Sequence, residues 1–375
     1  GSTYSSGHNA AFALVRYTVS GTLDRTFGGS GKVQTSFLSK NASADAAYAL
    51  VIQADGKIVA AGSSSSGFAD GIGLARYNAD GSLDTTFNGT GLVRTSIPGY
   101  SHAFGRDITL DQTGRIVVAG YTRVPSGENS PFVARYNANG SLDTTFGGTG
   151  IVVATQLHAY WIGGNVAVQS DGKVVVGWVN GLARYNSDGS LDDGSPTDST
   201  AGDHFGTNGI ANLPIAVSSL ALQSDGKIVA AQSQAIRLLA DGTLDLAFGN
   251  GGVSVTPPSP FNAANDMAIQ PDGRIVLAGD AGGAFGLVRF LGDAAPLMAA
   301  SAAARPVRET LAAAPIPPLL SETLSHWQAT GVMQEALAAG VRELPNGLQR
   351  VLSRESTELI FALRSLEQKS RDDQI

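Results

Sequence analysis

The sequence predicts an all-β repeat protein, and three observations lead to this class. Short runs of apolar and β-branched residues recur through residues 1–292, separated by Asp-Gly and similar turn pairs. The 375 residues include 47 glycines and only 15% charged residues, which suits short strands joined by tight turns. The same segments return every 47 to 60 residues. One β-rich module is therefore copied along the chain.

The clearest copy spans residues 46–87. Four apolar or alternating runs are expected to be strands, and Asp-Gly turns separate the first from the second and the third from the fourth. We expect strands A to D at residues 48–52, 57–61, 72–78 and 82–87. Each copy then forms a four-stranded antiparallel sheet.

An arginine on strand C and an aspartate eight residues later recur together from copy to copy. A functional site would need such a pair once, so its repetition indicates a structural role. We interpret the aspartate as a turn or backbone acceptor and the arginine as its partner or as a bridge between copies. The residues assigned to this role are Arg76, Asp84, Arg135, Asp143 and Arg184.

A period of this length with four strands per copy predicts a β-propeller, in which neighbouring blades cover the sheet faces that one copy cannot bury alone. Residues 1–16 match residues 120–135 at identical length, so we expect the chain to start inside a unit and the first blade to be incomplete. The last copy has runs for strands A to C without a strand D. Six blades are expected, with five or seven as alternatives.

The module also carries a recognisable signature. Residues 53–62 and 74–87 hold, nearly whole, Gln-x-Asp-Gly-Lys-Ile-Val-x-Ala-Gly and then Leu-Ala-Arg-Tyr-Asn-x-Asp-Gly-Ser-Leu-Asp-x-Thr-Phe-Gly. Through this recurring pattern, residues 1–290 resemble the delta-60 repeat family of bacterial proteins, and the unit is similar to NHL-type propeller repeats. The resemblance implies a propeller-like, usually exported module. It implies no catalytic residues.

The composition changes after the repeats. Residues 293–318 are rich in Ala and Pro and are expected to be a linker. Helical patterns follow in residues 319–375, where Leu359, Leu363 and Leu366 fall on one helix face. We therefore expect a small C-terminal α-helical segment that packs on itself, docks on the propeller or binds a partner.

The connections between the expected strands form a constant set and a variable set. The A–B and C–D turns, which resemble Asp-Gly throughout, lie on one face of a propeller, and the variable B–C and D–A loops lie on the other. Variation concentrated on one face indicates a binding surface on a fixed scaffold. Aromatic side chains there suit sugar rings or a protein partner, although individual ones could instead plug the channel or cap the core. The expected ligand-binding residues are Tyr100, His102, Tyr121, Arg123, His158, Tyr160, Trp161, Trp178 and Phe261.

An insertion at residues 193–204 interrupts one copy and is rich in acidic groups. Asp192, Asp193, Asp198 and Asp203 could hold calcium, although they lack the alternating spacing of calcium loops and a flexible surface loop is the alternative. The five histidines are scattered and predict no zinc site, and no other cofactor is expected. No catalytic motif is apparent, and no copy shows an isolated acid that departs clearly from the repeat.

Charge and hydropathy exclude some classes of function. The net charge of −7 argues against nucleic-acid binding, which needs a basic face. No apolar run reaches the length of about 18 residues that a membrane span requires. We therefore favour a non-catalytic extracellular or cell-surface module of a bacterium, which binds a glycan or a protein through its variable face. The alternatives are a propeller-fold carbohydrate-active enzyme (a glycoside hydrolase or lyase) with an axial active site, and a structural spacer of a larger surface protein.

Overall fold

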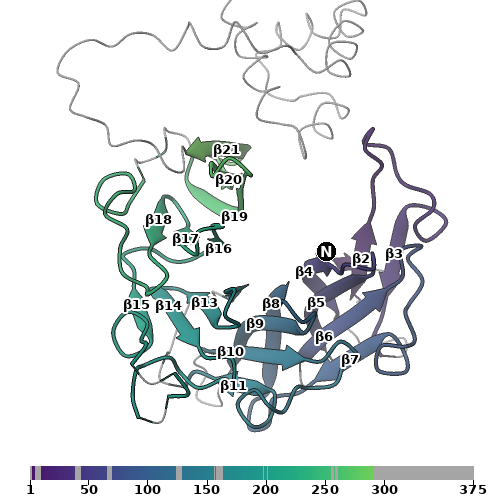
Figure 1. Cartoon of the computed structure of the whole chain (residues 1–375). Coiled ribbons are helices and arrows are strands. Elements are labelled where there is room, and N and C mark those ends of the chain that lie inside the picture. The colour runs from purple at the N-terminus through teal and green to yellow at the C-terminus, as the bar shows by residue number, and fades with distance from the viewer. Residues whose placement is uncertain are drawn as a thin grey trace, which may run out of the picture. The chain divides into compact units, whose positions relative to one another are not determined.

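The computed structural model is all-β and contains six antiparallel sheets (Figure 1). It describes residues 2–4, 10–38, 44–65, 70–123, 129–155, 157, 164–196, 198–200, 202–254, 257 and 261–290. Within these residues there is no helix long and apolar enough to cross a membrane. The expected linker 293–318 and helical segment 319–375 lie outside the described residues.

The first three sheets follow one another in chain order, and neighbouring strands within each sheet are antiparallel. The first sheet contains β1 (Ser2–Tyr4), β2 (Ala10–Val15) and β3 (Lys32–Thr35). The second contains β4 (Ala46–Ile52), β5 (Ile58–Ser65), β6 (Asp70–Tyr77) and β7 (Leu92–Thr95). The third contains β8 (His102–Leu110), β9 (Ile116–Arg123), β10 (Asn129–Tyr136) and β11 (Ile151–Val153).

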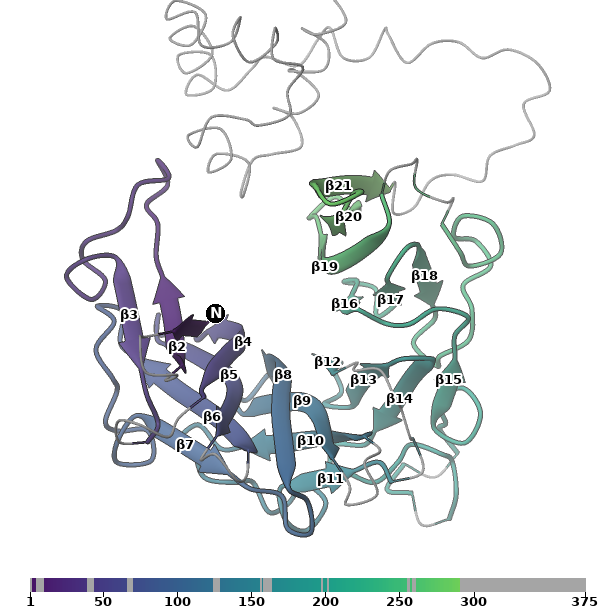
Figure 2. The same ribbon diagram turned by 180° about the vertical axis from the view of Figure 1, so that it is seen from behind.

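The last three sheets repeat the same order of strands, as the view from behind also shows (Figure 2). The fourth contains β12 (Asn165–Val168), β13 (Val174–Trp178), β14 (Gly181–Tyr185) and β15 (Ile210–Asn212). The fifth contains β16 (Ser219–Leu222), β17 (Ile228–Ala231) and β18 (Ala235–Leu238), and a bridge from Ile236 to Val253 extends it. The sixth contains β19 (Ala263–Ile269), β20 (Ile275–Asp280) and β21 (Phe285–Phe290).

The fourth strand of the module lies later in the chain than the sequence predicted. Residues 82–87 were expected to form it, but only Leu83 makes a β-bridge there, to Tyr77. The Asp84 carboxylate instead accepts hydrogen bonds from the backbone N–H and the hydroxyl of Thr86, at 3.1 and 2.7 Å, which folds the segment into a turn. The outer strand of this sheet is β7, which follows that turn.

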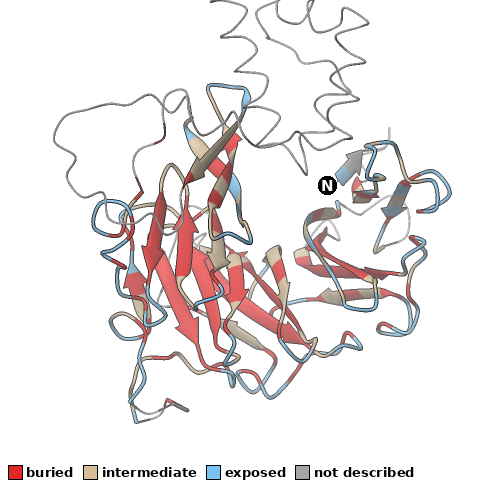
Figure 3. Ribbon diagram, turned by 45° about the horizontal axis from the view of Figure 1, so that its top comes forward, coloured by how far each residue is buried: buried red, intermediate tan, exposed pale blue. Residues whose placement is uncertain are grey.

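Hydrophobic cores lie between successive sheets. Ile72 and Leu74 of β6 pack in one core with Val118 of β9 and Phe132 of β10, and the same arrangement joins each later pair of sheets. Strands β5, β6, β9 and β10 are consequently buried on both faces (Figure 3). A single sheet could not cover both of its own faces, which explains why the module is repeated.

A β-bulge recurs in the first strand of several sheets and sets the direction of functional side chains. The pairing shifts register at Arg106, between Gly105 and Asp107, where β8 pairs with β9. The partner is Gly120, where an added Cβ would lie 1.8 Å from the Phe104 carbonyl oxygen. The second and sixth sheets repeat this shift, with Tyr48 and Asn265 as the extra residues. Bulges of this kind turn side chains in a new direction, here on the first strand of each of these three sheets.

Contacts within the chain place Arg16–Asp24 in a different compact unit from residues 1–15 and 25–297. Within Arg16–Asp24, Tyr17 bridges to Leu23 and the Arg16 Nε atom lies 2.8 Å from Asp24 Oδ2. This is a local copy of the arginine–aspartate pair of the repeats. All other described residues belong to the larger unit, which contains the six sheets.

Candidate functional site

In three successive repeats the recurring arginine and aspartate contact each other and also join that repeat to the next. Arg76 Nε donates to Asp84 Oδ2 at 2.7 Å, and its Nη1 donates to the carbonyl oxygen of Ala138 in the third sheet's turn. The guanidinium lies over the Phe87 ring, 4.6 Å from its centroid. These contacts bury both charges. The pair therefore stabilises the packing between sheets and is not accessible to a ligand.

The next two repeats make the same set of contacts. Arg135 Nε donates to Asp143 Oδ2 at 2.7 Å and its Nη1 donates to the carbonyl oxygen of Ser187, one repeat further on. Arg184 pairs with Asp192 and donates to the carbonyl oxygen of Ala240 in the same manner. The five residues given a structural role in the sequence therefore occupy equivalent places at the junctions between sheets.

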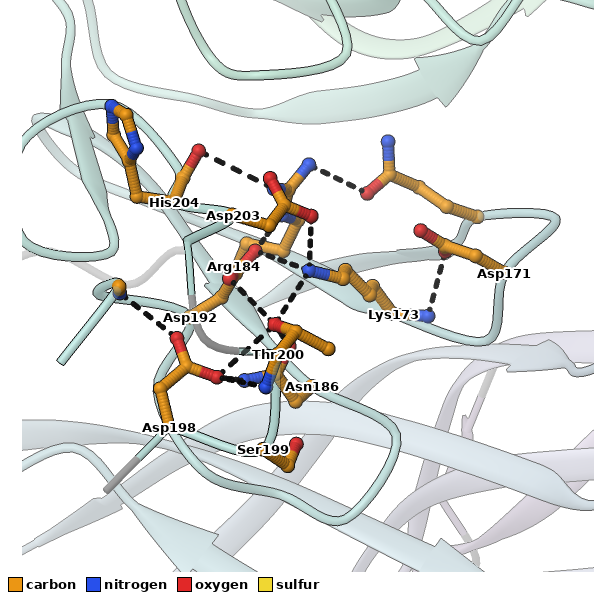
Figure 4. A network of polar contacts seen from close by, with 12 residues as sticks. Asp171, Lys173, Arg184, Asn186, Asp192, Asp198, Ser199, Thr200, Asp203 and His204 are labelled. Atoms are coloured by element: carbon orange, nitrogen blue, oxygen red, sulfur yellow. Dashed lines mark hydrogen bonds and ion pairs between the residues drawn. The ribbon is translucent and has the colours of Figure 1, made fainter. Parts of the chain in front are cut away.

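The insertion after Asp192 forms a network centred on two basic side chains (Figure 4). Lys173 Nζ lies 3.0 Å from Asp192 Oδ2 and 2.6 Å from Asp203 Oδ2, and Arg184 also contacts both carboxylates. The hydrogen bond from Lys173 is the largest influence that lowers the pKa of Asp203. Positive charge that a calcium ion would supply is thus already supplied by the chain.

The other two acidic groups of the insertion are held by amide groups. Asp198 accepts hydrogen bonds from the backbone N–H of Gly194 at 2.9 Å and of Thr200 at 2.8 Å, and Asp193 accepts one from Ser195 at 2.9 Å. The described residues contain no group of three or more acidic or histidine side chains placed to hold a metal ion. These contacts favour a structural loop over the calcium site suggested by the sequence.

A row of stacked rings lies on the third sheet, at the end where the variable loops leave it. The His102 and Phe104 rings of β8 stack with centroids 6.1 Å apart, and the Phe104 and Tyr121 rings stack with centroids 4.8 Å apart. His102 Nδ1 lies 2.7 Å from Asp70 Oδ2 of the second sheet. The row therefore reaches across the junction between the two sheets.

A cation on an aromatic ring lies two residues beyond Phe104 on the same strand, β8. The Arg106 guanidinium lies over the Tyr48 ring, 4.4 Å from its centroid, and Tyr48 is 45% exposed. Burial raises the pKa of Tyr121, and the charge of Arg106 opposes this rise. We call Tyr48, His102, Phe104, Arg106 and Tyr121 the aromatic rim.

The rim adjoins a cavity of about 1210 Å³ that residues of all six sheets line. We call it the axial cavity. Its walls are β2 and the edge strands β4, β8, β12, β16 and β19. Tyr48 and Arg106 belong both to the rim and to this lining, because the bulges turn them toward the cavity. The rim and the cavity thus form one continuous candidate site.

The cavity wall is polar at one level, where equivalent positions of the repeats carry different residues. The residue four positions before the start of each A–B turn faces the cavity. In the second sheet, where this turn is residues 53–56, it is Ala49. The other repeats place polar side chains there: Asp107, Asn165, Ser219 and Asp266. This corrects the expectation that no copy has an isolated acid, since two acids depart from the pattern at one site.

Asp107 is the most perturbed group of the cavity. Its two carboxylate oxygens accept hydrogen bonds from the backbone N–H groups of Ile108, at 2.8 Å, and Val166, at 2.9 Å. Burial raises its pKa to about 6, these hydrogen bonds oppose the rise, and the charge of Asp266 adds to it. Perturbed carboxylates in cavities are frequent at functional sites.

The structure brings together some of the ligand-binding residues predicted from sequence and separates others. His102 and Tyr121 belong to the rim, and Arg123 is exposed at the end of β9. Tyr100 and Phe261 are half-buried against hydrophobic cores.

Trp178 corrects the prediction most clearly, because it is buried in the core between the third and fourth sheets and not on a loop surface. Its large apolar ring is stabilised by that burial. Residues His158, Tyr160 and Trp161 lie outside the described residues.

Several residues of the site lie outside the variable loops, where the sequence predicted the ligand-binding residues. Tyr48, Phe104, Arg106, Asp107 and Asp266 all lie on strands. A signal for two of them was present, since an alignment of the repeats on the A–B turn places Asp107 and Asp266 at one position that is otherwise Ala, Asn or Ser. The bulges that redirect Tyr48 and Arg106 have no comparable signal.

Six segments of the chain match one family model, described as "Domain of unknown function (DUF5122) beta-propeller". The matched residues are 1–27, 53–87, 112–146, 169–194, 223–248 and 270–293. The matches coincide with the repeats seen in the structure, so the chain is a β-propeller repeat protein. It belongs to this family, which confirms the resemblance to the delta-60 repeats.

Solved structures with a similar arrangement are distant in sequence. The PQQ-bound aldose sugar dehydrogenase of Streptomyces coelicolor is 13% identical with a TM-score of 0.42, over 70% of this chain and 82% of that one. A gluconolactonase of Xanthomonas campestris is 13% identical with a TM-score of 0.32, over 68% and 74%. Likenesses at this level bear on neither substrate nor reaction. A comparison with curated proteins gives no match.

Proposed function

We propose that this protein is a non-catalytic binding module that recognises a glycan at the aromatic rim and the mouth of the axial cavity. The observation that carries the proposal is the row of rings from His102 through Phe104 to Tyr121, together with Tyr48 under Arg106. The apolar faces of sugar rings pack against aromatic faces, and their hydroxyl groups need polar partners close by. The polar wall of the cavity supplies such partners.

A glycan fits this site better than a folded protein domain does. The rim opens onto a cavity of about 1210 Å³, which is the size of a large small-molecule site and not of a flat interface. Protein surfaces that bind other proteins are typically broad patches with an apolar centre. The same proposal places the module at the surface of a bacterial cell or outside it, as the family resemblance implies.

Titration calorimetry with a panel of neutral, amino and acidic oligosaccharides tests this function. We expect binding by the wild-type protein, and roughly tenfold weaker binding, about 1.4 kcal/mol, after Tyr48→Ala or Tyr121→Ala. Leu246→Ala is the matched control, because Leu246 is 73% exposed and lies on a turn of the opposite loop face. Affinity that is unchanged in both tyrosine variants would place the site elsewhere, and the absence of any binding would favour the structural spacer.

A second candidate function rests on the Asp107 carboxyl. An acid whose pKa is raised to about 6 can donate a proton near neutral pH, and Asp266 supplies a second carboxyl in the same cavity. A glycoside hydrolase uses such a pair of acids. New reducing ends released from an oligosaccharide by the wild-type protein, but not by Asp107→Asn, would establish the enzyme and replace the binding module.

A further inference from the structure

Several hydrogen-bonding groups of the axial cavity already use a donor within the protein. The Asn165 side-chain N–H donates to the carbonyl oxygen of Val217 at 3.0 Å, and this acceptor fixes the orientation of the amide. The Asn165 carbonyl oxygen therefore points away from Val217, and the described residues offer it no donor. The amide keeps this acceptor, together with its second N–H, for a ligand.

Ser218, which precedes β16, and Ser219, the first residue of β16, also use their donors within the protein. The Ser218 hydroxyl lies 2.7 Å from the carbonyl oxygen of Ala264 and 2.9 Å from that of Ala231. The Ser219 hydroxyl donates to Asp266 Oδ1 at 3.2 Å. Each hydroxyl has one proton, so what remains toward the cavity is lone pairs.

The two carboxylates complete this set of acceptors. Asp107 and Asp266 each accept a hydrogen bond from the backbone N–H of the following residue, at 2.8 and 2.7 Å, and an ionised carboxylate has further lone pairs to offer. Arg106 is the cationic residue of the cavity lining, and its guanidinium lies on the Tyr48 ring. Arg106 and Asn265 bring donors to the lining, but the two carboxylates outnumber the one cationic side chain, so the polar wall carries more negative than positive charge.

We infer that the axial cavity selects, among glycans, those that carry a protonated amino group. This inference rests on the glycan-binding function proposed above and names its ligand class. An ammonium group has three donors and no acceptor, so it matches the amide oxygen, the hydroxyl lone pairs and the two carboxylates. It also neutralises the mutual repulsion of Asp107 and Asp266.

Other saccharides match the same wall less well. An N-acetyl group removes the charge, and with it the attraction to Asp107 and Asp266, and it leaves one N–H donor where the ammonium group has three. A uronic acid brings a negative charge toward Asp107 and Asp266, which is repulsive. A neutral sugar can still donate through its hydroxyl groups, and we expect it to bind with intermediate affinity.

Titration calorimetry of the whole protein with glucosamine, N-acetylglucosamine and galacturonic acid oligomers of equal length tests this ligand class. We expect the glucosamine oligomer to bind at least about tenfold more tightly than the N-acetylated one, since a hydrogen bond to a charged group contributes more than a neutral one. Its affinity falls with added salt, and that of the N-acetylated oligomer does not. The salt series needs no variant, so it remains decisive if a substitution impairs folding.

Two isosteric variants test whether the carboxylates of Asp107 and Asp266 cause the preference for the glucosamine oligomer. Asp107→Asn and Asp266→Asn are each expected to reduce the preference for the glucosamine oligomer, and the double variant to abolish it. Asp272→Asn is the charge-matched control, because Asp272 is an exposed residue on the A–B turn of the same sheet as Asp266. It should keep the full preference.

Three results would overturn the inference. Equal affinity for the glucosamine and N-acetylated oligomers, with loss of both in Tyr121→Ala, refutes amino-group selection and leaves the glycan-binding function standing. Tighter binding of the acidic oligomer refutes it as well. Failure of every oligosaccharide to bind refutes both the selection and the binding module.

Discussion

The Asp107 carboxylate of β8 accepts a hydrogen bond of 2.9 Å from the backbone N–H of Val166 on β12. One carboxyl group thereby joins the third sheet to the fourth and at the same time faces the axial cavity. Burial raises the pKa of this group to about 6, so its ionisation is linked both to the junction between the sheets and to the charge of the cavity.

This linkage predicts a pH dependence of stability with a defined sign. The folded pKa of Asp107, about 6, lies above the ordinary value of 3.8, so the folded protein binds this proton more tightly than the unfolded chain. Its contribution to stability is complete below pH 3.8 and is lost as the pH rises through 6. The loss reaches about 3 kcal/mol.

Denaturant unfolding of the wild-type protein and Asp107→Asn between pH 4 and about 7 measures this effect. The difference between the two curves should change across that interval, because the variant cannot ionise at this position. Asp266→Asn should reduce the change, since it removes one of the charges that raises the pKa of Asp107. Parallel curves for the wild-type protein and Asp107→Asn would contradict the linkage.

Gly120→Ala is expected to disturb both the fold and the site. A Cβ at this position would lie 1.8 Å from the Phe104 carbonyl oxygen, and a backbone atom cannot move aside as a side chain can. We expect a loss of about 3 kcal/mol in the free energy of unfolding and a displaced Arg106. Gly148→Ala is the comparison, because its added Cβ meets no atom within 4 Å, and only the left-handed backbone, about 1 kcal/mol, is at stake. Equal losses would mean that the close approach at the bulge is unimportant.

Arg135→Lys tests the structural role of the repeated arginines. Lysine retains the charge but cannot contact Asp143, the Thr145 hydroxyl and the Ser187 carbonyl oxygen together, as the guanidinium does. Thermal or denaturant unfolding should show a loss of about 2 kcal/mol. The matched change Arg274→Lys, at a side chain 43% exposed, should have little effect. Little effect at both sites would argue against the buried network as a junction between sheets.

The insertion near Asp192 should be insensitive to calcium. Lys173 and Arg184 already contact Asp192 and Asp203, so a divalent cation would have to displace two positive side chains. We expect the melting temperature of the wild-type protein to be the same with calcium and with a chelator. A higher melting temperature in calcium that is lost in Asp203→Asn would restore the calcium site.

Much of the architecture was predictable because it depends on features that repeat. Alternating apolar residues, the Asp-Gly turns and the period of the copies predicted repeated all-β units, with six as the expected number and five or seven as alternatives, and the structure contains six sheets. The position of the outer strand was not predictable from the same pattern. The segment Leu83–Phe87 is apolar enough for a strand, but the side chain of Asp84 binds the backbone two residues later and folds the segment into a turn.

The site was harder to predict than the fold. His102 and Tyr121 could be found because they break the repeat near variable loops. Tyr48 and Arg106 could not, because a strand pattern places successive side chains on opposite faces, and only the bulge turns these two toward the cavity. Trp178 is the converse case, since an aromatic residue beside a variable loop is equally suited to the core.

A crystal structure of the protein with a bound oligosaccharide tests the central claim most directly. We expect a sugar ring packed against Tyr48 or Tyr121, with its polar groups directed at Asp107, Asn165 and Asp266 in the axial cavity. A saccharide bound on the opposite face, among the Asp-Gly turns, with the rim and the cavity empty would contradict it.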